Sequence, residues 1–395
     1  MPFTRLDQMA EAPSAPSSGF ETTTTVVDVV ALSLADALAL GESRWDALRA
    51  RAESTSPFTR WAWHDAWYHT ASDDERDAAF ALVMRDEGGE LSALFPLATR
   101  RITYRRLGAT ALTWAVGDRG CPDHMDVLVA PWTALDEMAA AMDDMPWDML
   151  QLDGIASEAS GAPRLRAALA SRGITAILRP QWTCPYADLP ASWDEYVATR
   201  SPARRYTIRR RERRLAKVGA ISLTFYAGET RPRGWEHLRL LHDARWDGQG
   251  AFDEALDALH RRFAASLSAA DRLWLTTMDV ARVPVSAWYG FTEGDTLHAY
   301  QMGRSPEWSE YGVGGVHTGL IIQHAIARGL RRLDFMRGDE AYKADWATGS
   351  RWTQQLVAFR RTTKGRMLQL ADRAGTLRDQ LSHATTRDPD PAPSA

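Results

Sequence analysis

The order of elements in the second half of the chain restricts the possible folds more than any other feature. Three apolar, strand-like runs at residues 273–279, 283–292 and 296–302 are separated only by short polar turns at 279–282 and 293–295. Such short connections predict an antiparallel three-stranded meander. A long helical pattern at 315–328, which stops at Gly329, and a further strand at 333–336 follow. We therefore expect helices packed on a mixed sheet, an α/β (α+β) fold class.

The first half is also predicted to contain both helices and strands. The chain has 395 residues, of which 45% are hydrophobic and 25% charged, so it suits one large domain or two ordinary ones. We expect a disordered tail at 1–22, an N-terminal half at 23–185, a C-terminal half at 186–375 and a second tail at 376–395. Pro180, Pro185 and Pro190 mark the expected connector between the halves. Helices are expected at 32–52, 59–70, 133–142 and 162–172, and strands at 22–30, 79–84, 91–99, 111–116, 125–129, 149–152 and 174–178.

Several classes of protein lack a signal in this sequence. The net charge of −4 gives no global attraction to nucleic acid or membranes. No apolar window approaches the roughly 18 residues of a membrane-spanning helix, and no secretory signal is visible, so we expect a cytoplasmic protein without membrane insertion. The two cysteines, Cys121 and Cys184, fit neither a disulfide framework nor metal-ligand spacing. The histidines lack zinc spacing, and neither GxSxG nor HExxH occurs.

A glycine-rich segment, Tyr311-Gly312-Val313-Gly314-Gly315, lies between the meander and the long helix. Glycines allow a sharp turn and a close approach of a ligand to the backbone. The helix start offers unpaired N–H groups and a positive dipole end, which suit a pyrophosphate. The segment is neither a Walker motif nor a Rossmann fingerprint, and a purely structural loop is the alternative.

A dense set of ionisable residues follows the strand at 333–336. Arg337, Asp339, Glu340, Lys343 and Asp345 lie within nine residues, and only three lysines occur in the whole chain. Loops at strand ends display polar chemistry on a rigid scaffold, so this loop is a candidate site. The alternative is an exposed cluster of charges that neutralise one another.

Residues 200–217 carry a net charge of +8. Five of the basic residues, Arg204, Arg205, Arg209, Arg213 and Lys217, fall at helical spacing and form a basic face. This face predicts either a phosphate clamp for a nucleotide-bearing donor or a contact with an RNA backbone. The alternative is a solvated helix balanced by acidic neighbours.

Four further residues are candidates for substrate binding. His242 and Trp246 lie on a predicted helix, where a lone histidine is more often structural than functional. His298 and Tyr300 alternate on a strand and share one face, so both would reach a substrate if that face lined a cleft.

The second half resembles a known family. Its His242-x-x-Arg245-Trp246 segment, its meander ending in Tyr300-Gln301-Met302-Gly303, its glycine loop and the passage Asp334-Phe335-x-Arg337-Gly338-x-Glu340-x-Tyr342-Lys343 occur in one order. They resemble the GNAT-related acetyltransferase family that includes the CelD-like proteins of bacterial cellulose biosynthesis, and they are similar to the Fem-type aminoacyltransferases of peptidoglycan. The resemblance covers residues 190–362 well and 55–130 more loosely. It implies two GNAT-like halves packed together, the complete one C-terminal.

The resemblance further implies transfer of an acyl group from a thioester or ester donor to an amine. We expect acyl-CoA as cosubstrate, a small-molecule or sugar-precursor amine as acceptor, and direct transfer without a metal. Asp339 or Glu340 is expected to act as the base, and Lys343 to stabilise the oxyanion or hold an acidic group of the acceptor. The expected donor-binding residues are Gly312, Val313, Gly314, Gly315 and Arg205. The expected substrate-binding residues are Tyr300, His298, Arg337, Tyr342, His242 and Trp246.

Two other functions stay open at this point. An aminoacyl-tRNA donor would use the basic face of residues 204–217 to follow RNA, and its binding would depend steeply on salt. A non-catalytic accessory protein of polysaccharide biosynthesis would bind ligands without turnover.

Overall fold

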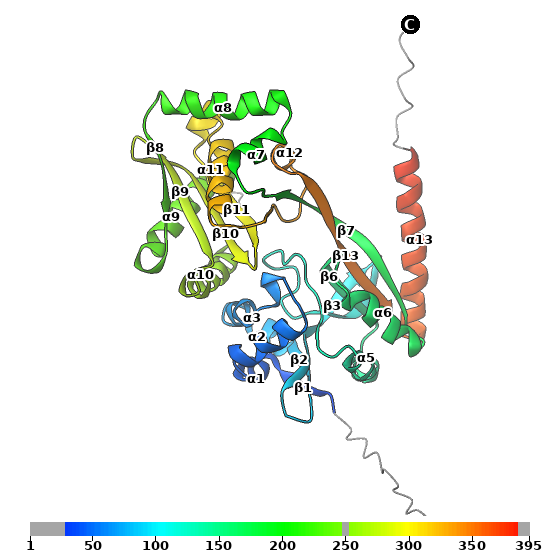
Figure 1. Ribbon diagram of the computed structural model, residues 1–395. Helices are drawn as coiled ribbons and strands as arrows, with labels where there is room; N and C mark the ends of the chain where they lie inside the picture. Colours follow the sequence, from blue (N-terminus) through cyan, green and yellow to red (C-terminus); the bar gives the residue numbers. More distant parts are fainter. Residues whose placement is uncertain (1–27, 247–252, 386–395) are drawn as a thin grey trace, which may run out of the picture.

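The computed structural model describes residues 28–246 and 253–385, with the side chains of 246 and 379–385 excepted (Figure 1). The N-terminal half contains β1 (Val30–Ser33), α1 (Leu34–Ala39), α2 (Glu42–Arg51), α3 (Trp61–Tyr68), α4 (Asp73–Asp77), β2 (Ala79–Arg85), β3 (Leu91–Tyr104), β4 (Leu107–Trp114), β5 (Leu128–Val129), α5 (Ala134–Asp144), β6 (Met149–Ala156), α6 (Gly161–Ser171) and β7 (Thr175–Asp188). The C-terminal half contains α7 (Trp193–Ala198), α8 (Pro202–Ala216), β8 (Ile221–Phe225), α9 (Arg231–Trp246), α10 (Glu254–Ala269), β9 (Leu273–Val280), β10 (Val283–Glu293), β11 (Thr296–Arg304), α11 (Val313–Ala327), β12 (Arg332–Asp334), α12 (Ala341–Ala344), β13 (Gly349–Phe359) and α13 (Thr363–Thr385).

The two halves repeat one topology. In the first, β1 to β4 pair antiparallel in sequence order, α5 follows, and β6 then pairs parallel with β4. In the second, β8 to β11 form the same antiparallel series, α11 follows, and β12 pairs parallel with β11. The predicted meander and the mixed α/β class are both confirmed, and the repeat gives two structurally equivalent halves.

The halves share one sheet because their last strands are exchanged. The strand order is β1-β2-β3-β4-β6-β13-β7-β12-β11-β10-β9-β8, with β5 paired to β3. β13, from the end of the C-terminal half, therefore pairs with β6, while β7, from the end of the N-terminal half, pairs with β12. Figure 1 shows β7 and β13 running together between the halves, with α13 beside them. This exchange joins the halves through backbone hydrogen bonds.

The proline connector predicted between the halves is right only at Pro190, which lies between β7 and α7. Pro180 and Pro185 lie inside β7, opposite Gln354 and Ser350 of β13. The other neighbour of β7, β12, pairs only with the residues from Tyr186 onward. The β12 side of β7 has no strand partner at Pro180, and at Pro185 the proline carbonyl accepts a hydrogen bond from the N–H of Phe335 at 2.9 Å, a contact that needs no proline N–H. The expected boundary after residue 185 consequently falls inside a strand.

Two other predicted boundaries also differ. The single helix expected at 32–52 is two helices, α1 and α2, because the chain turns at Gly41, whose φ is +91°. The tail expected from residue 376 is wrong as far as Thr385, since α13 continues to that residue. Residues 1–27, which contain the expected N-terminal tail, lie outside the described residues.

The main hydrophobic core crosses the boundary between the halves. Trp63 of α3 lies edge-on to Phe263 of α10, with ring centroids 5.0 Å apart. Phe58, just before α3, lies edge-on to Phe291 of β10 at 5.8 Å. All four side chains are fully buried. Burying such aromatic rings between the halves stabilises one common body rather than two separable units.

In the described ranges, no helix combines the length and apolarity needed to cross a membrane.

Candidate functional site

The candidate site lies where β11 and β12 diverge. These parallel strands pair only at Thr296–Arg332, Leu297–Leu333 and His298–Asp334. β11 continues to Arg304, so the edge of its last six residues that faces away from β10 is not covered by β12. Two neighbouring cavities lie along this open edge. We call them the donor cavity and the inner cavity.

The donor cavity, of about 280 Å³, lies at the start of α11. Gly312 has a left-handed conformation, with φ of +65° and ψ of +39°, and forms the N-cap of the helix. Gly312 has no side chain that could cap α11, and the Gly315 N–H donates to the Gly312 carbonyl at 3.0 Å. The N–H groups of Val313 and Gly314 are therefore the ones available to a ligand at the cavity wall formed by residues 312–315. The glycine loop thus lines a cavity.

Four arginines surround the same cavity: Arg204 and Arg211 from α8, Arg245 from α9 and Arg304 from β11. Among the described residues, the one carboxylate that lines it is Asp345, whose Oδ2 is 2.6 Å from Nη1 of Arg204. Burial lowers the pKa of Arg204 and of Arg245, which favours binding of an anion beside them. In the described part of the chain, no carboxylate is within ion-pair distance of Arg211. The cavity is therefore suited to an anionic ligand such as a phosphate.

Arg205, the predicted donor-binding arginine, does not line this cavity. Its side chain is half-buried, and Nη1 donates to the carbonyl of Ala198 at 3.1 Å. Neighbouring residues on a helix point about 100° apart, so Arg205 lies on the outer face of α8 with Arg209 and Arg213. The sequence analysis missed Arg211, although its spacing of seven from Arg204 places both on one helix face.

The inner cavity, of about 180 Å³, adjoins the donor cavity and shares Arg245, Met302 and Tyr342 with it. It brings together five predicted site residues, Tyr300, Arg337, Glu340, Tyr342 and Lys343. The N-terminal half contributes Cys121 and Asp123, which the sequence analysis did not single out. Burial raises the pKa of Tyr342 to about 12, so its hydroxyl stays protonated at neutral pH.

Lys343 is buried and has three partners. Its Nζ donates to the carbonyl of Arg337 at 2.5 Å and to that of Met336 at 3.4 Å, and lies 2.8 Å from Oε2 of Glu340. An ammonium group has three N–H donors, so none is left over for an oxyanion in this arrangement. Glu340 lines the inner cavity with 56% of its side chain exposed, whereas Asp339 is exposed and lines none of the described cavities.

Arg337 binds a loop of the N-terminal half. Its Nε donates to Oδ1 of Asp123 at 2.6 Å, its backbone N–H donates to Oδ2 at 2.8 Å, and Nη1 is 2.8 Å from Oδ1 of Asp118. The guanidinium also stacks over Trp182, 3.5 Å from the ring centroid. Burial raises the pKa of Asp123, and the Arg337 charge opposes this shift. Two carboxylates thus occupy the guanidinium that we expected to hold an anionic part of a substrate.

The remaining predicted residues lie elsewhere. His242 is buried on α9 behind β11, where its backbone N is 2.4 Å from the position of a Cβ added at Gly303, and it lines neither cavity. His298 shares the face of Tyr300 but lines a third cavity. The side chain of Trp246 lies outside the described residues. No group of three or more His, Cys, Asp or Glu side chains positioned to hold a metal ion occurs in the described ranges.

One family model matches this region. Residues 202–344 match the family described as the acetyltransferase (GNAT) domain. This range includes every residue that lines the donor cavity except Asp345 and Trp346. The chain accordingly contains a GNAT acetyltransferase domain, and the protein is an enzyme of the N-acyltransferase class.

Two solved structures share the fold across both halves. The crystal structure of FemX has a TM-score of 0.54 at 10% sequence identity, with 84% of this chain and 98% of that chain covered. The structure of L-PGS from Bacillus licheniformis has a TM-score of 0.50 at 11% identity, with 84% and 96% covered. At such identities the likeness concerns the fold alone. No curated protein matches the chain in sequence.

Proposed function

We propose that the protein transfers an acyl group from acyl-CoA, bound in the donor cavity, to the amine of a small molecule or sugar precursor in the inner cavity. The observation that carries this proposal is the start of α11 at Gly312, facing four arginines with one carboxylate among them. A helix start and guanidinium groups together are suited to a pyrophosphate. The resemblance to CelD-like proteins supports a role in polysaccharide biosynthesis, and the location we expect is cytoplasmic.

The reaction would take place at the junction of the two cavities. The amine nitrogen attacks the thioester carbonyl, the new C–N bond forms, and the C–S bond breaks as the thiolate leaves. An alkylamine with a pKa near 10.4 is less than about 0.1% neutral at pH 7, so a base is needed to take its proton. Glu340 is the carboxylate that lines the inner cavity and is open to solvent. A positioned base typically contributes about 10²–10⁴-fold to such a step.

Tyr342 is the group that we assign to the leaving thiolate. Its side chain lines both cavities, so the residue lies at the boundary that the acyl group must cross. Because its raised pKa keeps the hydroxyl protonated, it can donate a hydrogen bond or a proton to the sulfur. Two protons leave the nitrogen, the ammonium proton before the attack and a second one after the C–N bond forms, and the exposed Glu340 accepts each and releases it to solvent. Tyr342 gives one proton to the thiolate and regains one from solvent, so the products are the amide, the thiol and one free proton.

A second candidate, transfer from aminoacyl-tRNA, is favoured by the outer face of α8. Arg205, Arg209 and Arg213 line one shallow depression there, beside Tyr206, whose side chain is 60% exposed. Guanidinium groups and an exposed aromatic ring are what a single-stranded nucleic acid contacts. Figure 1 shows α8 lying across the end of the C-terminal half, above α11.

A matched pair of α8 variants separates the two donors. Calorimetry would measure binding of acetyl-CoA, longer acyl-CoAs and total tRNA to the full chain at low and moderate salt. With acyl-CoA as donor, Arg211→Gln should weaken its binding about 10–100-fold, which is the loss of one charge-assisted contact, and Arg205→Gln should leave it unchanged.

With aminoacyl-tRNA as donor, Arg205→Gln should weaken tRNA binding and reduce its salt dependence by about one ion. Binding of neither donor by the wild-type protein would contradict both proposals and favour an accessory role.

A further inference from the structure

A third cavity, which we call the lateral cavity, lies between the halves at the other end of the site. Its volume is about 790 Å³, larger than that of the donor and inner cavities. Residues from segments 51–56, 124–132 and 156–160 of the N-terminal half form most of its wall. The turn between β10 and β11, together with His298, Arg332 and Arg351, closes it from the C-terminal half.

The topological repeat places this cavity at an equivalent position to the donor and inner cavities. In the C-terminal half, those cavities are lined by the residues that lead into α11 and by those that follow β12. The lateral cavity is lined by Val129 to Trp132, which lead into α5, and by Glu158 to Ser160, which follow β6. Since α5 and β6 are the counterparts of α11 and β12, each half has a cavity at the same position of its fold.

The charge of the lateral cavity is opposite to that of the donor cavity. Five carboxylates line it, and three of them, Glu53, Asp126 and Asp295, have no basic side chain within ion-pair distance among the described residues. The arginines that line it have other partners. Arg351 pairs with Asp334 at 2.5 Å and with Glu158 at 2.7 Å, Arg332 pairs with Asp188 at 3.1 Å, and Arg51 donates to the carbonyl of Leu91.

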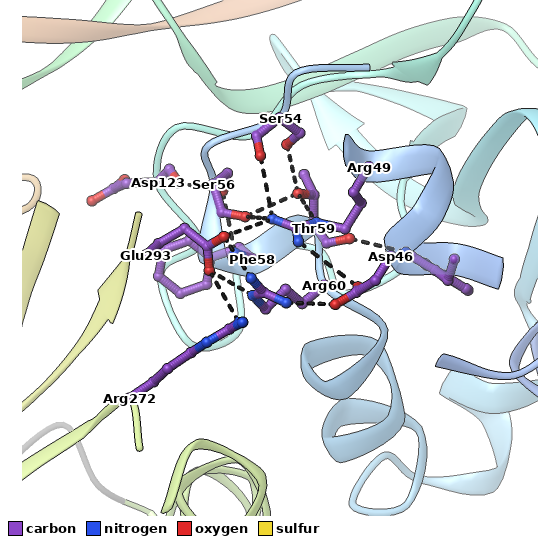
Figure 2. A network of polar contacts seen from close by, with 11 residues as sticks. Asp46, Arg49, Ser54, Ser56, Phe58, Thr59, Arg60, Asp123, Arg272 and Glu293 are labelled. Atoms are coloured by element: carbon purple, nitrogen blue, oxygen red, sulfur yellow. Dashed lines mark hydrogen bonds and ion pairs between the residues drawn. The ribbon is translucent and has the colours of Figure 1, made fainter. Parts of the chain in front are cut away.

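The fourth carboxylate, Glu293, is neutralised by arginines and is therefore not a group that would bind a cationic ligand. Figure 2 shows it between Arg49, Arg60 and Arg272. Its oxygens lie 2.5 Å and 2.6 Å from two nitrogens of Arg60, 3.4 Å from Arg49 and 3.7 Å from Arg272. These contacts fix the turn between β10 and β11 against α2 and α3. The carboxylates of the cavity that have no basic partner among the described residues are therefore Glu53, Asp126 and Asp295, and of these Asp126 is the most buried by the surrounding chain.

Asp126 is held in place by backbone groups alone. It accepts hydrogen bonds from the N–H of Val127, at 2.8 Å, and from that of Gly161 at the start of α6. Burial raises its pKa to about 6 in spite of these donors. A carboxylate in this position is stabilised by any cation that binds beside it.

His298 provides a second, independent indication of a ligand. Its side chain is 2% exposed, and in the described structure neither ring nitrogen has a hydrogen-bond partner. Buried polar groups are nearly always hydrogen-bonded, and an unpartnered one costs about 1–3 kcal/mol. The ring stacks on Phe291 at 5.9 Å and the residue lines the lateral cavity, so a small rotation of the buried ring toward the cavity would let a polar group of a ligand complete its hydrogen bonds.

We propose that the lateral cavity is a second ligand site that binds a small molecule carrying a protonated amine, with the ammonium group at Asp126 and a neighbouring polar group of the ligand at His298. Trp132 adds an aromatic ring to the cavity wall, with its centroid 5.0 Å from the Arg164 guanidinium. Because the lateral cavity is separate from the donor cavity, ligand binding there requires neither the acyl donor nor the proposed transfer reaction.

Binding of glucosamine to the full-length protein without donor tests this proposal. Calorimetry measures the affinity, and ¹⁵N-histidine NMR, assigned with His298→Gln, reports whether the His298 ring signals shift. Glucose is the uncharged control of the same size. Glucosamine should bind and shift His298, glucose should bind at least about 10-fold more weakly, and Asp126→Asn should weaken glucosamine by about 10-fold or more, the loss of one charge-assisted contact.

Two further variants distinguish the sites. Ser160→Trp places a bulky ring in the lateral cavity and should abolish glucosamine binding. The Ser160 side chain makes no capping hydrogen bond to α6, so this variant remains informative even if Asp126→Asn destabilises that helix. Glu340→Gln changes the inner cavity, where the proposed acceptor amine would also bind, and should leave unchanged the binding that shifts the His298 signals. Equal binding of glucose, insensitivity to both lateral-cavity variants, loss of the His298 shift in Glu340→Gln, or an absence of any glucosamine binding would each overturn the proposal. None of these outcomes bears on acyl-CoA binding in the donor cavity.

Discussion

Replacement of Lys343 by methionine tests whether this residue positions the loop or takes part in the reaction. The Lys343 ammonium group is 5% exposed and connects the carbonyls of Met336 and Arg337 to the carboxylate of Glu340. The loop it closes is conformationally unusual, because Met336 has a φ of +59° and Gly338 a φ of +114°. Methionine keeps a similar length and apolar stem but removes all three donors.

The expected loss of stability follows from these contacts. A hydrogen bond to a charged group contributes about 1.5–3 kcal/mol, and burial of an ammonium group offsets part of the total. We therefore expect Lys343→Met to lower the free energy of unfolding by about 2–4 kcal/mol. For a protein of this size, with an unfolding entropy near 2 cal/mol/K per residue, that corresponds to a fall in Tm of about 3–5 °C.

Calorimetry and denaturant titration of the variant measure this change, and Lys364→Met is the matched control. The Lys364 ammonium pairs with Asp148 at 2.8 Å, but its side chain is 53% exposed, and exposed pairs contribute about 0–1 kcal/mol. Lys343→Met should lower stability clearly more than Lys364→Met does. An unchanged Tm together with a turnover rate reduced by about 100-fold or more would refute this reasoning and restore the role of Lys343 as an oxyanion cation.

Three other predictions concern single groups. His64 is fully buried, and burial lowers the pKa of its imidazole to about 3. The unfolded chain therefore binds a proton on His64 near pH 6.5 while the folded chain does not, so the free energy of unfolding falls as the pH drops below that value. Between pH 7 and pH 5 this fall is about 2 kcal/mol, and His64→Phe should remove it in denaturant titrations. Gly312→Ala places a Cβ 2.8 Å from Nε of Arg211 at a φ of +65°, so calorimetry should find acyl-CoA binding weakened several-fold and stability lowered by about 1–2 kcal/mol. Tyr342→Phe should slow turnover by about 100-fold in steady-state assays with little change in the KM for acyl-CoA, and an unchanged turnover rate would exclude the hydroxyl from the transfer step.

The sequence predicted those parts of the site that arise from local order along the chain. The glycine loop and the passage from Arg337 to Lys343 follow strand or turn elements directly, so their meeting at the end of β12 could be expected. Arg204 and Arg211 were within reach of the same reasoning through their spacing of two helical turns. Arg205 does not line the donor cavity, because helical spacing defines faces but not which face is covered.

The parts that could not be predicted depend on pairing between distant segments. The exchange of β7 and β13 brings residues 175–188 beside residues 349–359, and no local pattern in either segment specifies that partner. The contribution of Asp123 to the inner cavity has the same origin, because Arg337 lies 214 positions further along the chain. Contacts of this kind are set by the global packing of the halves, not by local propensity.

The geometry of one N-terminal loop shows that the first half completes the inner cavity. The Tyr300 hydroxyl donates to the carbonyl of Gly120 at 2.6 Å, so the loop at 118–123 is bound from the C-terminal side. From the N-terminal side, a Cβ at Gly120 would lie 2.7 Å from the Trp63 ring, and Gly120 has a φ of +76°, so only glycine fits there. With Asp123 held by Arg337, the loop is fixed at three points, two of them on the C-terminal half. The exchanged strands join the halves, and the N-terminal half therefore forms part of the inner cavity, where we propose that the acceptor binds.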